Sequence, residues 1–313
     1  MPIHDLGYRA WQGRLMPEAS RFWVIAQTGI RLAGKNRWLR RLLLLAWVPA
    51  LYLGVAVFLF EQALANQSYM RVALEFVGPF PGTEVVRQAM QAGDPAVARH
   101  TAWTWLLLMF FRYPQGLLMA LVVGLIAPPL VAKDVQSRAF LLYFSRPLTR
   151  VEYILGKLVV VWAYVMMITT LPALSLYVVG VLLSPPDTAV IASTWDLPLR
   201  ILGASVVLMI PTAALALAFS SLTSRTFYAG FAWFAVWLLG LVAYITLQYF
   251  VLLHIPEHWV LLSLYHTLGR VQDWVFGLQT SLSAVWPSAV LLAGIAVVSL
   301  AVLFRRVSSP MRI

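Results

Sequence analysis

Residues 146–157 read RPLTRVEYILGK and separate two strongly apolar runs, Leu117–Ala132 and Leu158–Leu183. The stretch combines positive charge with a proline that breaks helices. It also holds a helix start, because Thr149 followed three residues later by Glu152 is the pattern of a capping box. A charged turn between two apolar runs predicts that the chain leaves a membrane, turns at its surface and enters it again.

The composition of the whole chain agrees with this interpretation. Of its 313 residues, 61% are hydrophobic and only 11% are charged, and the mean hydropathy is +0.80. Such a chain has more apolar surface than one soluble core can bury, and a membrane-spanning helix needs about 20 apolar residues. We therefore predict an all-α polytopic membrane protein, a single transmembrane domain over 1–313, with six transmembrane helices at Leu42–Phe60, Leu117–Ala132, Leu158–Leu183, Ile201–Phe219, Phe227–Leu253 and Val285–Phe304.

Two long segments between these runs are predicted to lie on one side of the membrane. The first is an external loop, 61–115, in which Trp103–Phe111 is apolar but too short to cross alone. Because 112–115 (RYPQ) separates it from the second run, we expect Trp103–Phe111 to be an interfacial or re-entrant piece. The second is an external segment, 254–284, which we expect to re-enter the membrane before the sixth span.

Basic residues indicate the orientation. They concentrate before the first run, between the second and third runs, at Arg225 and after the last run, whereas the other loops show no positive excess. The positive-inside rule then places the basic segments and both termini in the cytoplasm. The formal net charge of +11 follows these flanks, so we expect contact with the lipid bilayer rather than with nucleic acid.

The segment 18–41 shows helical amphipathicity. Arg21, Thr28 and Arg31 fall on one stripe, while Phe22 and Ile25 fall on another. This pattern predicts an interfacial elbow helix that lies in the headgroup plane. It would either anchor the first span only or also touch a cytoplasmic partner.

Two motifs could indicate catalysis. Gly29–Asn36 has the spacing of a phosphate-binding loop, but Asn36 stands where magnesium needs a Ser or Thr hydroxyl, and an amphipathic helix replaces the required strand. His254, Glu257 and His258 have the letters of an H-x-x-E-H zinc site, without a specified third ligand and with Pro256 between the histidines. We therefore expect no catalytic, cofactor or metal site in this chain, and a metalloenzyme remains the less favoured alternative.

The segment 133–157 carries the functional signal. Its apolar centre between charged ends suits a short helix at the cytoplasmic surface, which Pro147 would end before the next helix begins at Thr149. The residues that form this pattern are Asp134, Ser137, Arg138, Leu141, Leu142, Ser145, Arg146, Pro147, Arg150, Tyr153, Gly156 and Lys157.

This pattern, placed between the second and third spans, resembles the coupling loop in permease subunits of export-class ABC transporters, the type 2 permease family. The resemblance covers the chain in outline, although the long first external loop departs from many simple members. It implies a substrate path through the membrane, coupled through residues of 133–157 to two separate cytoplasmic ATPase subunits that hold ATP and Mg²⁺. It also implies a second permease copy or paralogue, and location in the plasma membrane of a prokaryote, the inner membrane if Gram-negative.

The same resemblance leaves room for an extracytoplasmic accessory protein. A different class of function also fits the six spans, a membrane scaffold or assembly factor that transports nothing and needs no ATPase. The sequence does not identify a substrate.

Overall fold

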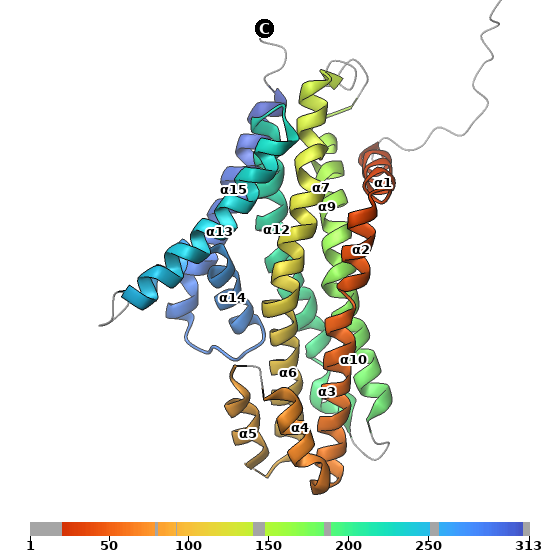
Figure 1. Ribbon diagram of the computed structural model, residues 1–313, viewed down its shortest axis with the longest axis vertical. Helices are drawn as coiled ribbons and strands as arrows, with labels where there is room; N and C mark the ends of the chain where they lie inside the picture. Colours follow the sequence, from red (N-terminus) through yellow and green to blue (C-terminus); the bar gives the residue numbers. More distant parts are fainter. Residues whose placement is uncertain are drawn as a thin grey trace, which may run out of the picture.

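The computed structural model describes residues 21–78, 81–91, 93–139, 148–184, 189–250 and 257–308, and these residues fold into helices without a β-strand among them. The helices form an elongated bundle in which most long axes run side by side (Figure 1). In chain order the elements are α1 (Arg21–Ala33), α2 (Arg37–Leu45), α3 (Val48–Ala65), η2 (Gln67–Tyr69), α4 (Met70–Val77), α5 (Thr83–Gln91), α6 (Pro95–Phe110), the π-helical turn η3 (Phe111–Gln115), α7 (Gly116–Gln136), α9 (Arg150–Ile168), α10 (Thr170–Leu183), α11 (Val190–Thr194), α12 (Leu197–Leu222), α13 (Thr226–Phe250), η4 (Glu257–Leu262), α14 (Leu264–Val275) and α15 (Leu282–Ser308).

Six helical stretches in the described residues are long and apolar enough to cross a membrane, which confirms the predicted class of an all-α multi-pass membrane protein. Each contains all or most of one predicted run. Several extend well beyond the predicted bounds, because polar residues at the ends continue the helix. The six stretches are Arg37–Ala65, Pro95–Gln136, Arg150–Leu183, Val190–Leu222, Thr226–Tyr249 and Leu282–Ser308.

Trp103–Phe111 is not cut off from the second span, because α6, η3 and α7 form one continuous helical stretch of 42 residues. The prediction of a separate re-entrant piece is therefore wrong, and an interfacial position of Trp103–Phe111 stays a prediction. Pro114 cannot donate a backbone hydrogen bond, and the wider π turn around it lets the helix continue. The polar side chains of this turn find partners on neighbouring helices. Gln115 Nε2 donates to the Ala46 carbonyl oxygen at 2.9 Å, where α2 gives way to α3. The segment 61–115 is thus largely helical, and its last part belongs to the second membrane-length stretch.

Helix α1 lies across one end of the bundle, nearly end-on in the view of Figure 1, and packs on α9. Glycine permits this close approach: a Cβ atom on Gly156 would lie 2.8 Å from Ile25 Cβ, and one on Gly29 would lie 2.5 Å from Val160 Cγ2. The predicted amphipathic helix therefore exists but ends at Ala33, and Arg37, Arg40 and Arg41 already belong to α2.

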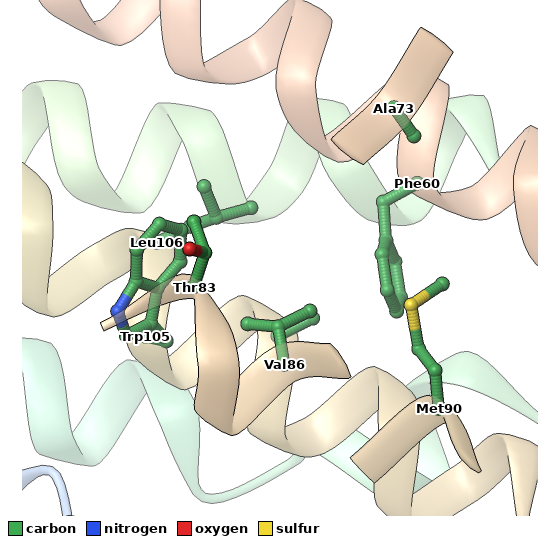
Figure 2. Close-up of a pocket in the computed structure, with 8 residues that line it drawn as sticks. Phe60, Ala73, Thr83, Val86, Met90, Trp105 and Leu106 are labelled. Atoms are coloured by element: carbon green, nitrogen blue, oxygen red, sulfur yellow. The ribbon is translucent and has the colours of Figure 1, made fainter. Parts of the chain in front are cut away.

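Two buried apolar clusters hold the long helices together. One joins α7, α9, α12 and α15, and the other joins α3, α6, α10 and the start of α12. Helix α5 is fixed to the second cluster by apolar side chains around a cavity of only about 20 Å³. Figure 2 shows Val86 and Met90 of α5 facing Phe60 of α3 and Trp105 and Leu106 of α6. This cavity has room for little more than one water molecule, so it is a packing seam and not a substrate site.

A buried ion pair connects α3 with α6. The Arg99 guanidinium donates to both carboxylate oxygens of Glu61, with Nε at 2.9 and 3.1 Å and Nη2 at 3.0 Å. Trp103 Nε1 donates to the same carboxylate at 3.0 Å. The side chains of Arg99 and Glu61 are only 5% and 1% exposed, so each charge depends on the other for its stabilisation.

Glu61→Gln should destabilise the protein strongly, because it leaves the Arg99 charge buried without a carboxylate. We expect a loss of about 3–5 kcal/mol in the free energy of unfolding. Glu75→Gln is the matched control, since Glu75 pairs with Arg71 on the surface and such exposed pairs contribute about 0–1 kcal/mol. Thermal unfolding of the purified proteins in detergent compares the two. Equal behaviour of both variants would contradict the assignment.

Candidate functional site

Three of the residues predicted in 133–157 meet where α7 ends and α9 begins. Asp134 of α7 accepts a hydrogen bond from the Tyr153 hydroxyl at 2.7 Å and pairs with Lys157 Nζ at 2.7 Å. Lys157 also donates to the Leu130 carbonyl oxygen at 2.6 Å. The side chains of Lys157 and Asp134 are 12% and 15% exposed, and Tyr153 is buried. This cluster therefore ties the two helices together at the base of the segment between them.

The ends of both helices are well defined by local contacts. Ser137 Oγ donates to the Lys133 carbonyl oxygen, and Arg138 has a positive φ of 53°, which turns the chain away from the axis of α7. At the start of α9 the predicted capping box is present between Thr149 and Glu152. Arg150 is the first residue of α9.

The centre of the predicted coupling segment is not covered by the structure. Leu141, Leu142, Ser145, Arg146 and Pro147 lie outside the described residues. The short surface helix predicted there stays a prediction. What the structure describes is its two attachments, the end of α7 and the start of α9.

Gly156, another predicted residue, lies against α1. A Cβ atom on it would lie 2.9 Å from the Phe22 carbonyl oxygen. About two turns further along α9, the Tyr164 hydroxyl donates to the Ile30 carbonyl oxygen at 2.7 Å. Helices α1, α7 and α9 are thus linked as one unit at this end of the bundle.

A second polar arrangement, which the sequence analysis did not predict, surrounds a cavity of about 280 Å³ between η3, α13, α14 and the start of α15. We call it the arginine cavity. Arg112 Nη1 donates to both carboxylate oxygens of Asp273 at 3.1 and 3.0 Å. The rings of Tyr244 and His266 lie 3.8 Å apart between centroids. The polar side chains that line it belong to Arg112, Tyr244, His266, Arg270, Asp273 and Gln279.

Burial shapes the electrostatics of the arginine cavity. It lowers the pKa of His266 to about 4, with a further contribution from the charge on Arg112. The imidazole is therefore neutral at physiological pH. Burial also raises the pKa of Asp273, and the ion pair with Arg112 opposes this shift. Two guanidinium groups and one carboxylate give the lining a net positive charge.

The structure describes the first of the two catalytic motifs and leaves the second untested. Gly29 lies inside α1, and the Asn36 side chain accepts a hydrogen bond from the Trp38 backbone N–H, so Asn36 caps α2. His254 lies outside the described residues, as do the side chains of Glu257 and His258. Within the described part of the chain, no three metal-ligating side chains come together.

Comparison with known proteins identifies no family for this chain. No model of a known protein family matches the sequence, and no curated protein matches it significantly.

The hydroxyl of Tyr153 should contribute measurably to stability, because it bonds to a largely buried carboxylate. Tyr153→Phe is expected to lower the free energy of unfolding by about 1.5–3 kcal/mol, the usual range for a hydrogen bond to a charged group. Tyr228→Phe is the control, since Tyr228 is 55% exposed. Thermal unfolding in detergent provides the measurement, and an unchanged Tyr153→Phe protein would disprove the linkage.

The protein should lose stability in acid partly through His266. Unfolding restores its pKa to about 6.5, so between that value and about 4 the unfolded chain binds a proton that the folded chain does not. Stability therefore falls as the pH falls through this window. The charged and titratable groups that face the imidazole are Arg112, Tyr244, Tyr265, Arg270 and Asp273.

His266→Asn removes the part of the acid-induced loss of stability that comes from this imidazole. The melting temperature of the variant should fall less than that of the wild type between about pH 7.5 and about pH 5, because only the wild type gains a proton at this position on unfolding. Parallel melting curves at the two pH values provide the test. An identical fall in both proteins would show that His266 titrates as it does in the unfolded chain.

Proposed function

We propose that this chain is the membrane subunit of an ATP-driven exporter, in which 133–157 couples the helices to separate cytoplasmic ATPase subunits. The observation that carries the proposal is the cluster of Asp134, Tyr153 and Lys157 at the base of that segment. A segment anchored in this way transmits a displacement to α7 and α9 together. The sequence pattern of 133–157 is similar to that of type 2 permeases, and this similarity indicates that the partner is an ATPase subunit.

The neighbouring contacts support a mechanical role. Helix α1 packs closely on α9 at Gly156 and accepts the hydrogen bond from Tyr164 at Ile30. A movement of α9 therefore carries α1 with it. Helices that are packed side by side transmit such movements as rigid bodies. Arg138, Arg146 and Arg150 are suited to pair with carboxylates on the partner. ATP and Mg²⁺ belong to the ATPase, and this chain contributes no catalytic residue.

Helix α13 supports a second permease copy or paralogue as a further partner. Only 6% of the most apolar part of α13 is buried, whereas 72% of the corresponding part of Pro95–Gln136 is buried. It also diverges from the bundle in Figure 1. A helix so little covered contacts lipid or another subunit, and a substrate path between two permeases requires such a surface. In this arrangement both termini are cytoplasmic, in a prokaryotic plasma membrane.

The proposal is tested by charge reversal in the coupling segment. The tagged chain is purified from its native membrane under gentle extraction, and bound proteins are identified while ATPase activity is measured with Mg²⁺. We expect a nucleotide-binding protein with the wild type, and loss of its binding or of its coupled activity, by about tenfold or more, in Arg146→Glu/Arg150→Glu, because interfacial charge pairs contribute several kcal/mol.

The control is Arg71→Glu/Arg87→Glu, which reverses two charges in the exposed α4–α5 region. It should behave as the wild type does. If no ATPase associates with the wild-type chain, or if both double variants lose activity equally, the exporter proposal fails and the scaffold alternative takes its place.

A further inference from the structure

Three exposed arginines lie on one face at the start of α2. They are Arg37, Arg40 and Arg41, and their spacing of three and four residues makes them neighbours on the helix surface. The sequence has no Asp or Glu over 21–60, and none of the three arginines forms an ion pair within the residues that the structure describes. The guanidinium of Arg41 lies over the Trp38 ring, 5.1 Å from its centroid. Like charges at this spacing repel one another, so an anion bound between the arginines would stabilise this turn of α2.

The face that carries these arginines continues into an apolar groove. Helices α2 and α3 belong to one helical stretch and follow one another along one side of the bundle (Figure 1). A groove of about 470 Å³ lies between α3 and α10 and begins at Trp47. Residues at intervals of three or four lead from Arg41 along this face: Leu44, Trp47, Leu51, Val55 and Phe58. The last four line the groove, and Leu44 is 74% exposed between the arginines and the groove. One face of the helix therefore offers positive charge and an apolar groove in succession, as the two parts of a phospholipid require.

The arginines and the groove lie at successive depths. Helices α7 and α15 end in basic residues at the same end of the bundle (Figure 1), which we call the basic end. The groove lies farther from this end than the arginines do, since Trp47 follows Arg41 by six residues, about 9 Å along the helix. The headgroup layer of one leaflet is about 5–8 Å thick, and the apolar stem of an arginine lets its charged group extend toward that layer. A phosphate bound by the arginines therefore brings its acyl chains to the start of the groove.

The length and lining of the groove suit an acyl chain. From Trp47 to Phe58 the helix advances by eleven residues, about 16 Å, and the hydrocarbon of one leaflet is about 15 Å deep. Apart from Ser175 and the indole N–H of Trp47, the residues that line the groove are apolar. Gly54 keeps it open, because a Cβ atom there would already lie 3.7 Å from Leu176 Cδ1, and a longer side chain would fill the space.

A second copy of this chain fits this surface poorly. In a twofold dimer the same surface of both chains meets itself. The arginines of two copies would then lie at the same depth, and 21–60 provides no acid to separate their charges. The little-covered helix α13, which we propose to contact a second permease, lies on the other side of the bundle in Figure 1. A phospholipid supplies both the missing negative charge and the apolar chain.

We propose that this face binds one anionic phospholipid from the leaflet at the basic end of the bundle. Arg37, Arg40 and Arg41 donate charge-assisted hydrogen bonds to the phosphate oxygens, and one acyl chain lies along the groove between α3 and α10. Basic side chains next to a membrane helix are typical binding places for anionic headgroups. The groove makes the site specific, because it holds a chain in one position, whereas lipid elsewhere on the bundle exchanges over a convex surface.

The first test removes the charges. The full-length protein in an uncharged detergent is titrated with phosphatidylglycerol, and bound lipid is counted by native mass spectrometry. We expect saturable binding of one lipid to the wild type and at least about tenfold weaker binding to Arg37→Gln/Arg41→Gln, because each basic residue near an anionic headgroup contributes about fivefold. The control is Lys133→Gln/Arg225→Gln, which removes two exposed charges from α7 and the start of α13. It should bind as the wild type does.

The second test fills the groove and leaves every charge in place. Gly54→Leu should weaken phosphatidylglycerol binding at least about tenfold, because the new side chain excludes the acyl chain, whose burial contributes about 0.8 kcal/mol per CH₂ group. Gly294→Leu is the matched control, since nothing lies within 4 Å of a Cβ atom at that position of α15. Glycerol 3-phosphate, which has the phosphate without the chains, should bind to the wild type at least about tenfold more weakly than the lipid.

Several outcomes would overturn the proposal. It is wrong if Arg37→Gln/Arg41→Gln keeps full affinity, if both double variants lose affinity equally, or if glycerol 3-phosphate binds as tightly as the lipid. It is also wrong if Gly54→Leu separates a wild-type dimer into monomers without weakening lipid binding, because the groove would then be an interface between copies. If Gly54→Leu does not fold, Val55→Phe, at a half-exposed position of the same groove, takes its place with the same expectation. None of these outcomes depends on whether an ATPase associates with the chain.

Discussion

The structure depends on the mismatch between one helix and the membrane. Pro95–Gln136 contains 42 residues, whereas the hydrocarbon core accepts about 20. Roughly half of this helix must therefore lie outside the apolar layer, and its polar residues show where. Glu61 and Arg99 pair beyond the π turn, and Arg112 lies in it. The helices packed around Pro95–Gln136 satisfy these charges, because lipid cannot.

The same requirement is met at several places along the bundle. At the basic end, Asp134 compensates Lys157 between α7 and α9. Farther along the bundle, Asp273 compensates Arg112 between η3 and α14. Asp196, at the start of α12, pairs with His100 of α6 and with Arg200 of its own helix. All of these pairs except Asp196–Arg200, which lies within one helical turn, connect different helices. The buried and half-buried charges of these pairs thus act as links between helices.

The sequence predicted the class and the number of spans because apolar length is a local property, readable without knowledge of neighbours. The capping box at Thr149 and Glu152 was equally local, and it is present. The prediction that 112–115 separates Trp103–Phe111 from the second span was wrong. Gln115 and Arg112 find partners at the end of α2 and on α14, and no local sequence pattern predicts those contacts. The arginine cavity was missed for the same reason, although its distance from Lys133, about one membrane thickness, was a readable signal.

The π turn at Phe111–Gln115 also fixes the angular phase of the helix. In an α-helix one residue corresponds to about 100° of rotation, and a π turn contains one residue more than an α turn. The faces of α6 that meet α3 and the faces of α7 that meet α9 are therefore set by this single extra residue. For the packing of the helix, the length of this turn therefore matters more than its composition. A change of one residue there would turn the outer half of the helix, and everything packed on it, away from the inner half.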